Sequence, residues 1–140
     1  MITFFVLSSA AILLIIALVH VYWAVGGRWG AEAVIPRTKD DTRQLFTPGT
    51  AGTMLVALLL LSAAYLLMAQ GGYLSQLFPP ALLYLGCAVC AAVFVLRAVG
   101  DFRYIGFFKK MRHTRFAHND TWLYSPLCLW LGLSFVLALL

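Results

Sequence analysis

The chain has 140 residues, of which 63% are hydrophobic and only 11% are charged, and its mean hydropathy is +0.92. This composition lies far outside the usual balance of soluble domains, so it excludes a soluble globular protein and predicts an integral membrane protein. The formal net charge of +5 does not indicate nucleic-acid binding, because the basic residues are confined to the connections that flank apolar runs.

Four apolar runs follow one another along the chain, over residues 3–25, 50–70, 80–99 and 121–140. Each run is about 20 residues long, which as a helix spans the roughly 30 Å of bilayer hydrocarbon. The runs are continuous rather than alternating, which favours helices over strands. The first run lacks a basic segment before it, so we interpret it as a span and not as a signal peptide. The sequence therefore predicts an all-α fold, a four-helix transmembrane bundle forming one domain over residues 1–140.

The ends of these runs carry residues typical of helix ends. Glycine pairs follow the first and second runs as expected of C-terminal caps, and a proline opens the third run. These residues are Gly26, Gly27, Gly71, Gly72 and Pro80. Pro126 lies inside the fourth run and predicts a bend between Tyr124 and Pro126.

All ten lysines and arginines fall in the first or third connection or at its edge. They are Arg28, Arg37, Lys39, Arg43, Arg97, Arg103, Lys109, Lys110, Arg112 and Arg115. The positive-inside rule therefore places both long connections in the cytoplasm and both termini outside. All five acids and all three histidines share this face, so we expect any binding or chemistry on the cytoplasmic side.

The third run passes into the third connection within the sequence "LRAVGDFRYIGFFKKMRH", residues 96–113. This connection mixes aromatic with basic residues. Apolar residues recur at every third position, which predicts a short amphipathic helix lying in the membrane interface. Its apolar face comprises Phe102, Ile105, Phe108 and Met111. We interpret Lys109, Lys110 and Arg112 as solvated anchors that face anionic headgroups.

An arginine and an aspartate one helical turn apart close the third run. Arg97 and Asp101 have the i, i+4 spacing of an ion pair, with Arg103 as a second partner for the carboxylate. Such a pair serves either a functional site or the stapling of a helix bundle, and the sequence leaves both interpretations open.

His20 lies about 9 Å inside the cytoplasmic end of the first run. An intramembrane histidine needs hydrogen-bond partners, and the candidates at the same end are Asp101, Tyr124 and Ser125. We therefore take His20 and Asp101 as the candidate acid–base residues.

Metal and redox sites receive little support. His113 and His118 are out of phase on a helix, and the alternative of chelation by His118 with Asp120 in a loop is weak. Cys87 and Cys90 form a C-x-x-C inside an apolar run without a second cysteine pair outside it, which is typical of packing residues. We predict no metal and no cofactor.

Two sequence blocks, "HVYWAVGGRWG" and "GDFRYIGFFKK" with "TRFAHNDTWLYSPLC", resemble a family of small bacterial four-helix membrane proteins known as a domain of unknown function. The likeness covers nearly the whole chain and implies a location in the bacterial cytoplasmic membrane, without implying an activity. Its recurring positions correspond here to His20, Tyr22, Trp23, Gly26, Gly27, Trp29, Gly100, Asp101, Arg103, Asp120 and Pro126.

Our first interpretation is a cytoplasm-facing polar pocket that binds a small amphipathic ligand or a lipid headgroup, with a membrane-embedded enzyme as a variant. The ligand-binding candidates are Tyr22, Trp23, Arg97, Arg103, Asp120 and Tyr124. A small transporter or channel is the second interpretation, although the outer half of the bundle carries no charge. The third is an accessory subunit that packs through a small-residue face of the third span, which would also serve homo-oligomers. That face comprises Gly86, Ala88, Cys90 and Ala92.

Overall fold

The computed structural model describes residues 1–36, 42–100 and 102–140, and over these residues the chain is helical with no β-strand. The elements are α1 (Ile2–Ala24), α2 (Ala31–Val34), α3 (Thr50–Gln70), α4 (Pro80–Val99), α5 (Arg115–Asn119), the π-helical turn η1 (Asp120–Tyr124) and α6 (Ser125–Leu139). The last three form one continuous helical stretch. The predicted all-α fold is confirmed, and four helices are long and apolar enough to cross a membrane.

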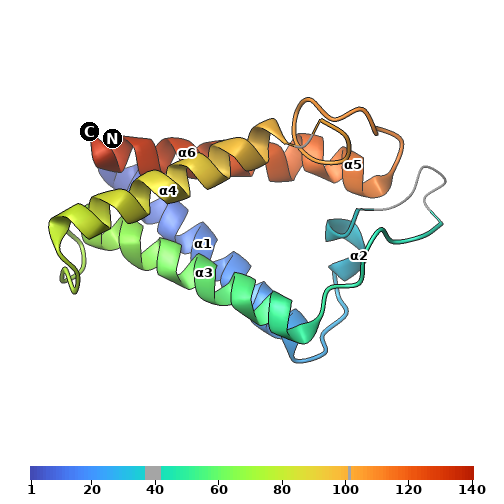
Figure 1. Cartoon of the computed structure of the whole chain (residues 1–140), viewed down its shortest axis with the longest axis horizontal. Coiled ribbons are helices and arrows are strands. Elements are labelled where there is room, and N and C mark those ends of the chain that lie inside the picture. The colour runs from blue at the N-terminus through green and yellow to red at the C-terminus, as the bar shows by residue number, and fades with distance from the viewer. Residues whose placement is uncertain (37–41, 101) are drawn as a thin grey trace.

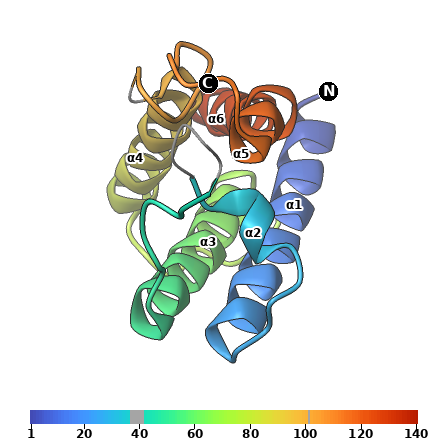
Figure 2. The same ribbon diagram turned by 90° about the vertical axis from the view of Figure 1, so that its right-hand side faces the viewer.

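The four long helices form two antiparallel pairs. α1 packs mainly along α3, and α4 packs mainly along α6. Figure 1 shows that the pairs meet at the end that holds both termini and the turn between α3 and α4, and diverge towards the other end. The end-on view in Figure 2 shows α2 lying between the two diverging pairs. We call the first end the converging end and the second, with α2 and α5, the polar end.

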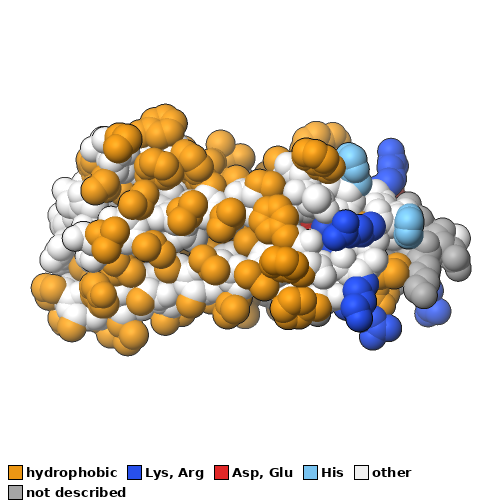
Figure 3. Space-filling view, turned by 90° about the horizontal axis from the view of Figure 1, so that it is seen from above, with side chains coloured by type: hydrophobic (Ala, Val, Ile, Leu, Met, Phe, Trp, Pro, Cys, Tyr) orange, Lys and Arg blue, Asp and Glu red, His pale blue; other side chains and the backbone are white. Residues whose placement is uncertain are grey.

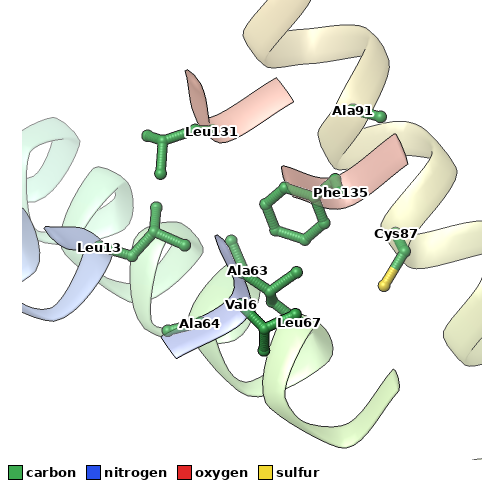
Figure 4. Close-up of a cluster of buried hydrophobic side chains, with 9 residues drawn as sticks. All are labelled: Val6, Leu13, Ala63, Ala64, Leu67, Cys87, Ala91, Leu131 and Phe135. Atoms are coloured by element: carbon green, nitrogen blue, oxygen red, sulfur yellow. The ribbon is translucent and has the colours of Figure 1, made fainter. Parts of the chain in front are cut away.

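A cluster of nine buried apolar side chains joins the two pairs, and Figure 4 shows members from all four long helices. They are Val6, Leu13, Ala63, Ala64, Leu67, Cys87, Ala91, Leu131 and Phe135. A buried hydrogen bond from the Ser9 hydroxyl to the Ser134 hydroxyl, 2.7 Å long, adds a polar link between α1 and α6. The core therefore combines leucines and Phe135 with small side chains, and the small ones allow the four helices to approach one another.

Two glycines allow close contacts between helices. A Cβ at Gly132 of α6 would lie 2.8 Å from Val95 Cγ2 of α4, and one at Gly86 of α4 would lie 2.9 Å from Leu66 Cδ1 of α3. Gly86 therefore already packs within the chain, and it belongs to the face that the sequence assigns to a partner. Binding of a second copy by the rest of that face stays a prediction.

Charge is segregated along the long axis of the molecule. On the face shown in Figure 3, apolar side chains cover most of the length, whereas lysine and arginine side chains gather at the polar end. This distribution agrees with the sequence pattern and gives the polar end its name.

The segment between α4 and α5 departs from the sequence prediction. A short helix does lie between the third and fourth spans, but it is α5, and residues 102–114 form bends and turns instead of the predicted amphipathic helix. Gly100 and Gly106 lie against each other with φ of 91° and 88°, and a Cβ on either would strike the backbone of the opposite segment. A hydrogen bond from Phe107 N to Ala98 O, 2.9 Å long, closes this turn. The glycine pair thus folds the backbone sharply back where a helix would continue straight.

Pro126 lies in the first turn of α6, directly after the π-helical turn η1. Where the sequence predicts a bend between Tyr124 and Pro126, the backbone N–H of Ser125 donates to Asp120 O across five residues. Such π turns are common at functional sites, and this one sets the direction in which Asp120 and Ser125 point.

Candidate ligand site at the polar end

A fully buried carboxylate, that of Asp120, organises the polar end. Its Oδ1 accepts from Arg97 Nη2 at 2.9 Å, and its Oδ2 accepts from Lys109 Nζ at 2.9 Å and from the backbone N–H of Gly106 at 2.7 Å. Asp120 therefore ties α4, the turn after α4 and the start of η1 together. A carboxylate can be buried in this way because charged and backbone donors replace the water it has lost.

Lys109 is the second buried member of this group, with a side chain only 1% exposed. Besides Asp120, its ammonium donates to Thr121 Oγ1 at 2.6 Å and to Gly106 O at 3.1 Å, so all three donors are used. The prediction that Lys109 is a solvated, headgroup-facing anchor is therefore wrong. Lys110 and Arg112 are exposed, as that prediction requires of them.

Arg97 is the third member, and its side chain is 31% exposed. Among the described residues it forms an ion pair with Asp120, which is 23 residues away along the chain. Asp101, the partner predicted for Arg97 or Arg103, lies outside the described residues. Within the described residues, two cations thus surround one buried carboxylate, and these three side chains together carry an excess of positive charge.

Three buried side-chain atoms have no hydrogen-bond partner in the described part of the chain: Arg97 Nη1, Ser125 Oγ and Trp130 Nε1. The Trp130 ring stacks on Phe5 of α1, with 4.4 Å between ring centroids. The other two atoms belong to the facing helices α4 and α6 at the polar end. Unpaired buried donors are rare and each asks for an explanation.

The first sequence block forms the turn after α1. Gly27 N donates to Tyr22 O at 2.9 Å, Gly26 has φ of 100°, and Trp23 Nε1 donates to Trp29 O at 2.8 Å. The Tyr22 ring lies against Gly27, where any Cβ would clash with it. Tyr22 and Trp23 therefore hold this turn in shape, and their contact with a ligand stays a prediction.

His20 points along its own helix. Its Nδ1 lies 2.8 Å from Ile16 O, and its ring meets the Trp23 ring edge-on with 5.1 Å between centroids. Of its predicted partners, Tyr124 donates through its hydroxyl to Ala33 O at 3.0 Å, and Asp101 is not described. The acid–base role of His20 and Asp101 stays a prediction.

Arg103 belongs to the glycine-closed turn. Its guanidinium carbon lies 5.2 Å from the centre of the Tyr104 ring, a cation–π contact. The role of Arg103 in holding an anionic group stays a prediction.

Two apolar surface grooves lie away from this charge cluster. One, of about 370 Å³, runs along α1 and reaches Tyr22 and Trp29, and the other, of about 400 Å³, lies between α3 and α4. Both are lined almost wholly by apolar atoms, so they differ from the polar pocket that the sequence suggests.

Within residues 1–36, 42–100 and 102–140, no group of three or more histidine, cysteine, aspartate or glutamate side chains is arranged to hold a metal ion. The Asp120 carboxylate, considered as a partner for His118, is already bound by Arg97 and Lys109.

Residues 13–135 match the family described as a protein of unknown function, DUF3995. The chain belongs to this family. No curated protein and no solved structure matches it. The resemblance inferred from the two sequence blocks is thereby confirmed at the level of a family of unknown function.

In this DUF3995 protein, sequence reasoning missed Lys109 and the unpaired hydroxyl of Ser125. The Lys109–Lys110 doublet gives no local sign of which lysine is buried. The repeated glycine of "GDFRYIG" was the available signal, because two glycines six residues apart permit the sharp turn that carries Lys109 back towards Asp120.

Proposed function

We propose that this protein is a multi-pass protein of the bacterial inner membrane that binds the anionic head of a small amphipathic ligand or lipid at its polar end. The four apolar helices and the gathering of charge at one end support the membrane part of the proposal. The excess positive charge around Asp120 supports the anionic head of the ligand. The low dielectric constant at the membrane border strengthens the attraction between this positive charge and an anion.

The observation that carries this proposal is the hydrogen bonding of the Arg97 guanidinium. One terminal nitrogen is fixed by Asp120, while the other is buried without a partner among the described residues. The guanidinium is thus held in one orientation with a donor to spare. The helices that carry the ion pair also bear exposed apolar side chains, including Leu96, the residue before Arg97 on α4, and Leu123 in η1. A fixed cation beside exposed apolar surface suits a molecule with an anionic head and an apolar tail.

Lipid retention by the purified full chain tests this proposal. We expect native mass spectrometry in detergent to show preferential binding of phosphatidylglycerol over phosphatidylcholine, and Arg97→Gln to remove the preference. Asp120 keeps Lys109 as its ion-pair partner in this variant, so the fold should persist. Lys110→Gln is the matched control, because it removes one exposed positive charge from the same end and should leave the preference intact.

Equal binding of both lipids by the unmodified protein would contradict the proposal. So would an equal loss of preference in Arg97→Gln and Lys110→Gln, which would indicate attraction by net charge rather than by a built site.

We further propose that the polar end lies in the cytoplasm and both termini outside, because the basic residues flank that end. A reporter that is active only in the periplasm should work when fused after Leu140, and a cytoplasmic reporter should fail there. The reverse pattern would invert the proposed orientation.

A further inference from the structure

We infer that the anionic group bound at the polar end is a phosphate held by two helices at once, through Arg97 Nη1 of α4 and the Ser125 hydroxyl of α6. This inference rests on the proposed function and names the chemistry of its ligand. It also assigns Ser125, so far considered only as a partner of His20, as a ligand-binding residue.

The burial of Ser125 is the first step. The residue is fully buried, and its Oγ finds no partner within the described part of the chain. Elsewhere the buried serine hydroxyls of this protein are paired, as Ser9 is with Ser134 and Ser134 with Trp130 O at 2.9 Å. A serine that only fills space would be better replaced by alanine, because an unpaired buried hydroxyl is destabilising. Its hydroxyl is thus free to serve a ligand.

The direction of Ser125 is the second step. It precedes Gly132 by seven residues, about two helical turns, so the two lie on nearly the same face of α6. Gly132 packs against Val95 of α4, with 3.3 Å between a Cβ built on it and Val95 N. Ser125 therefore lies about 10 Å closer to the polar end on the side of α6 that faces α4, whereas Arg97 lies about 3 Å beyond Val95 along α4. The Arg97 side chain reaches in that direction, because its guanidinium binds Asp120.

The π turn is the third step. Ser125 N donates to Asp120 O, so one π-helical turn joins the two residues. In an α-helix residues five apart point in different directions, whereas a π turn brings them close to alignment. Because Asp120 holds Arg97, this turn places the Ser125 hydroxyl on the same side of the helix as the guanidinium.

The chemistry of the two donors is the last step. One is an N–H of a guanidinium that Asp120 has already oriented, and the other is a hydroxyl from a facing helix. Donors that approach from two sides suit a group with at least two acceptor oxygens and negative charge, and guanidinium geometry fits phosphate well. At a membrane border a phosphate is available from lipid headgroups and from free phosphate, and the test separates these sources.

The experiment measures binding of short-chain phosphatidylglycerol to the full chain in detergent by native mass spectrometry. We expect Ser125→Ala to weaken binding about tenfold, the effect of one hydrogen bond to a charged group. Arg97→Lys should weaken it comparably, because a lysine held by Asp120 presents no second fixed nitrogen. Ser134→Ala is the matched control, since it removes a buried hydroxyl far from the polar end and should leave the affinity unchanged.

Inorganic phosphate and a fatty acid of equal chain length complete the test. A lipid phosphate is indicated if phosphatidylglycerol binds more tightly than the fatty acid and resists competition by inorganic phosphate. Efficient competition by inorganic phosphate indicates free phosphate as the source. If the fatty acid binds as tightly as phosphatidylglycerol, both to the unmodified protein and to the two variants, the assignment of phosphate is overturned.

Two outcomes separate this inference from the proposed function. If the unmodified protein prefers phosphatidylglycerol but Ser125→Ala retains full affinity, the inference fails and the proposed function stands. A lowered melting temperature with full affinity would then mark the hydroxyl as structural. If the unmodified protein binds neither phosphatidylglycerol nor phosphatidylcholine, both fail together.

Discussion

The converging end and the polar end of the molecule are held together by different kinds of contact. At the converging end the helix pairs meet through a cluster of small and large apolar side chains and one hydrogen bond between serines, Ser9 and Ser134. At the polar end a buried carboxylate binds two cations, but all of its partners lie on or near α4 and η1, within one pair. The bond from Tyr124 to Ala33 links that pair to α2.

This difference explains why the helix pairs converge at one end and diverge at the other. Lipid is as apolar as leucine, so apolar helix surfaces gain little free energy from burying each other, and close packing with polar bonds decides where helices meet. At the converging end the buried cluster of small and large apolar residues provides that packing between the pairs. At the polar end the ion pairs fold the turn after α4 onto η1, and within the described residues α2 joins the two pairs through its contacts with α5 and the bond from Tyr124 to Ala33.

Removing the central carboxylate gives the largest expected effect. Asp120→Asn leaves Arg97 and the buried Lys109 facing each other without a counter-charge, and we expect a loss of about 3 kcal/mol in the free energy of unfolding. Unfolding of the detergent-solubilised protein measures it. The double variant that adds Lys109→Met should lose less than the two single changes together, because it removes a charge that Asp120→Asn leaves unpaired. Strict additivity would show that the cluster does not act as a unit.

The neighbouring lysines offer a sharper comparison within the polar end. Lys109→Met removes a buried ammonium with three partners, while Asp120 keeps Arg97, so we expect a loss of about 2 kcal/mol in the free energy of unfolding. Lys110→Met changes an exposed side chain next to it and should have no measurable effect. Equal results for the two variants in the same unfolding assay would contradict the burial of Lys109.

The smallest expected effect lies at the converging end. Ser134→Ala leaves the Ser9 hydroxyl without its partner, and hydrogen bonds between membrane helices average about 0.6 kcal/mol in unfolding free energy. Ser62→Ala is the control, because its exposed hydroxyl bonds to Leu58 O of its own helix. A loss at Ser134 as large as that at Asp120 would remove the contrast between the two ends.

The sequence alone determined the helices and the placement of charge. The second and third spans were predicted at Thr50–Gln70 and Pro80–Val99, the same bounds as in the structure, and the first differs by one residue at each end. The fourth helical stretch begins earlier than predicted, at Arg115, because Thr114 caps it by accepting from Ala117 N. These features follow from local properties: an unbroken apolar run must form a helix in lipid, and charge must remain at its ends.

Only the tertiary structure decided which charged residues meet. Arg97 pairs with Asp120 of another helix, a partner that the sequence did not suggest, while its predicted partner Asp101 lies outside the described residues. Lys109 and Lys110 are equivalent in sequence, and a turn closed by Gly100 and Gly106 buries one and exposes the other. The physical reason is that burial of a charge depends on partners brought together from distant parts of the chain, whereas a membrane span depends on the run of residues that forms it.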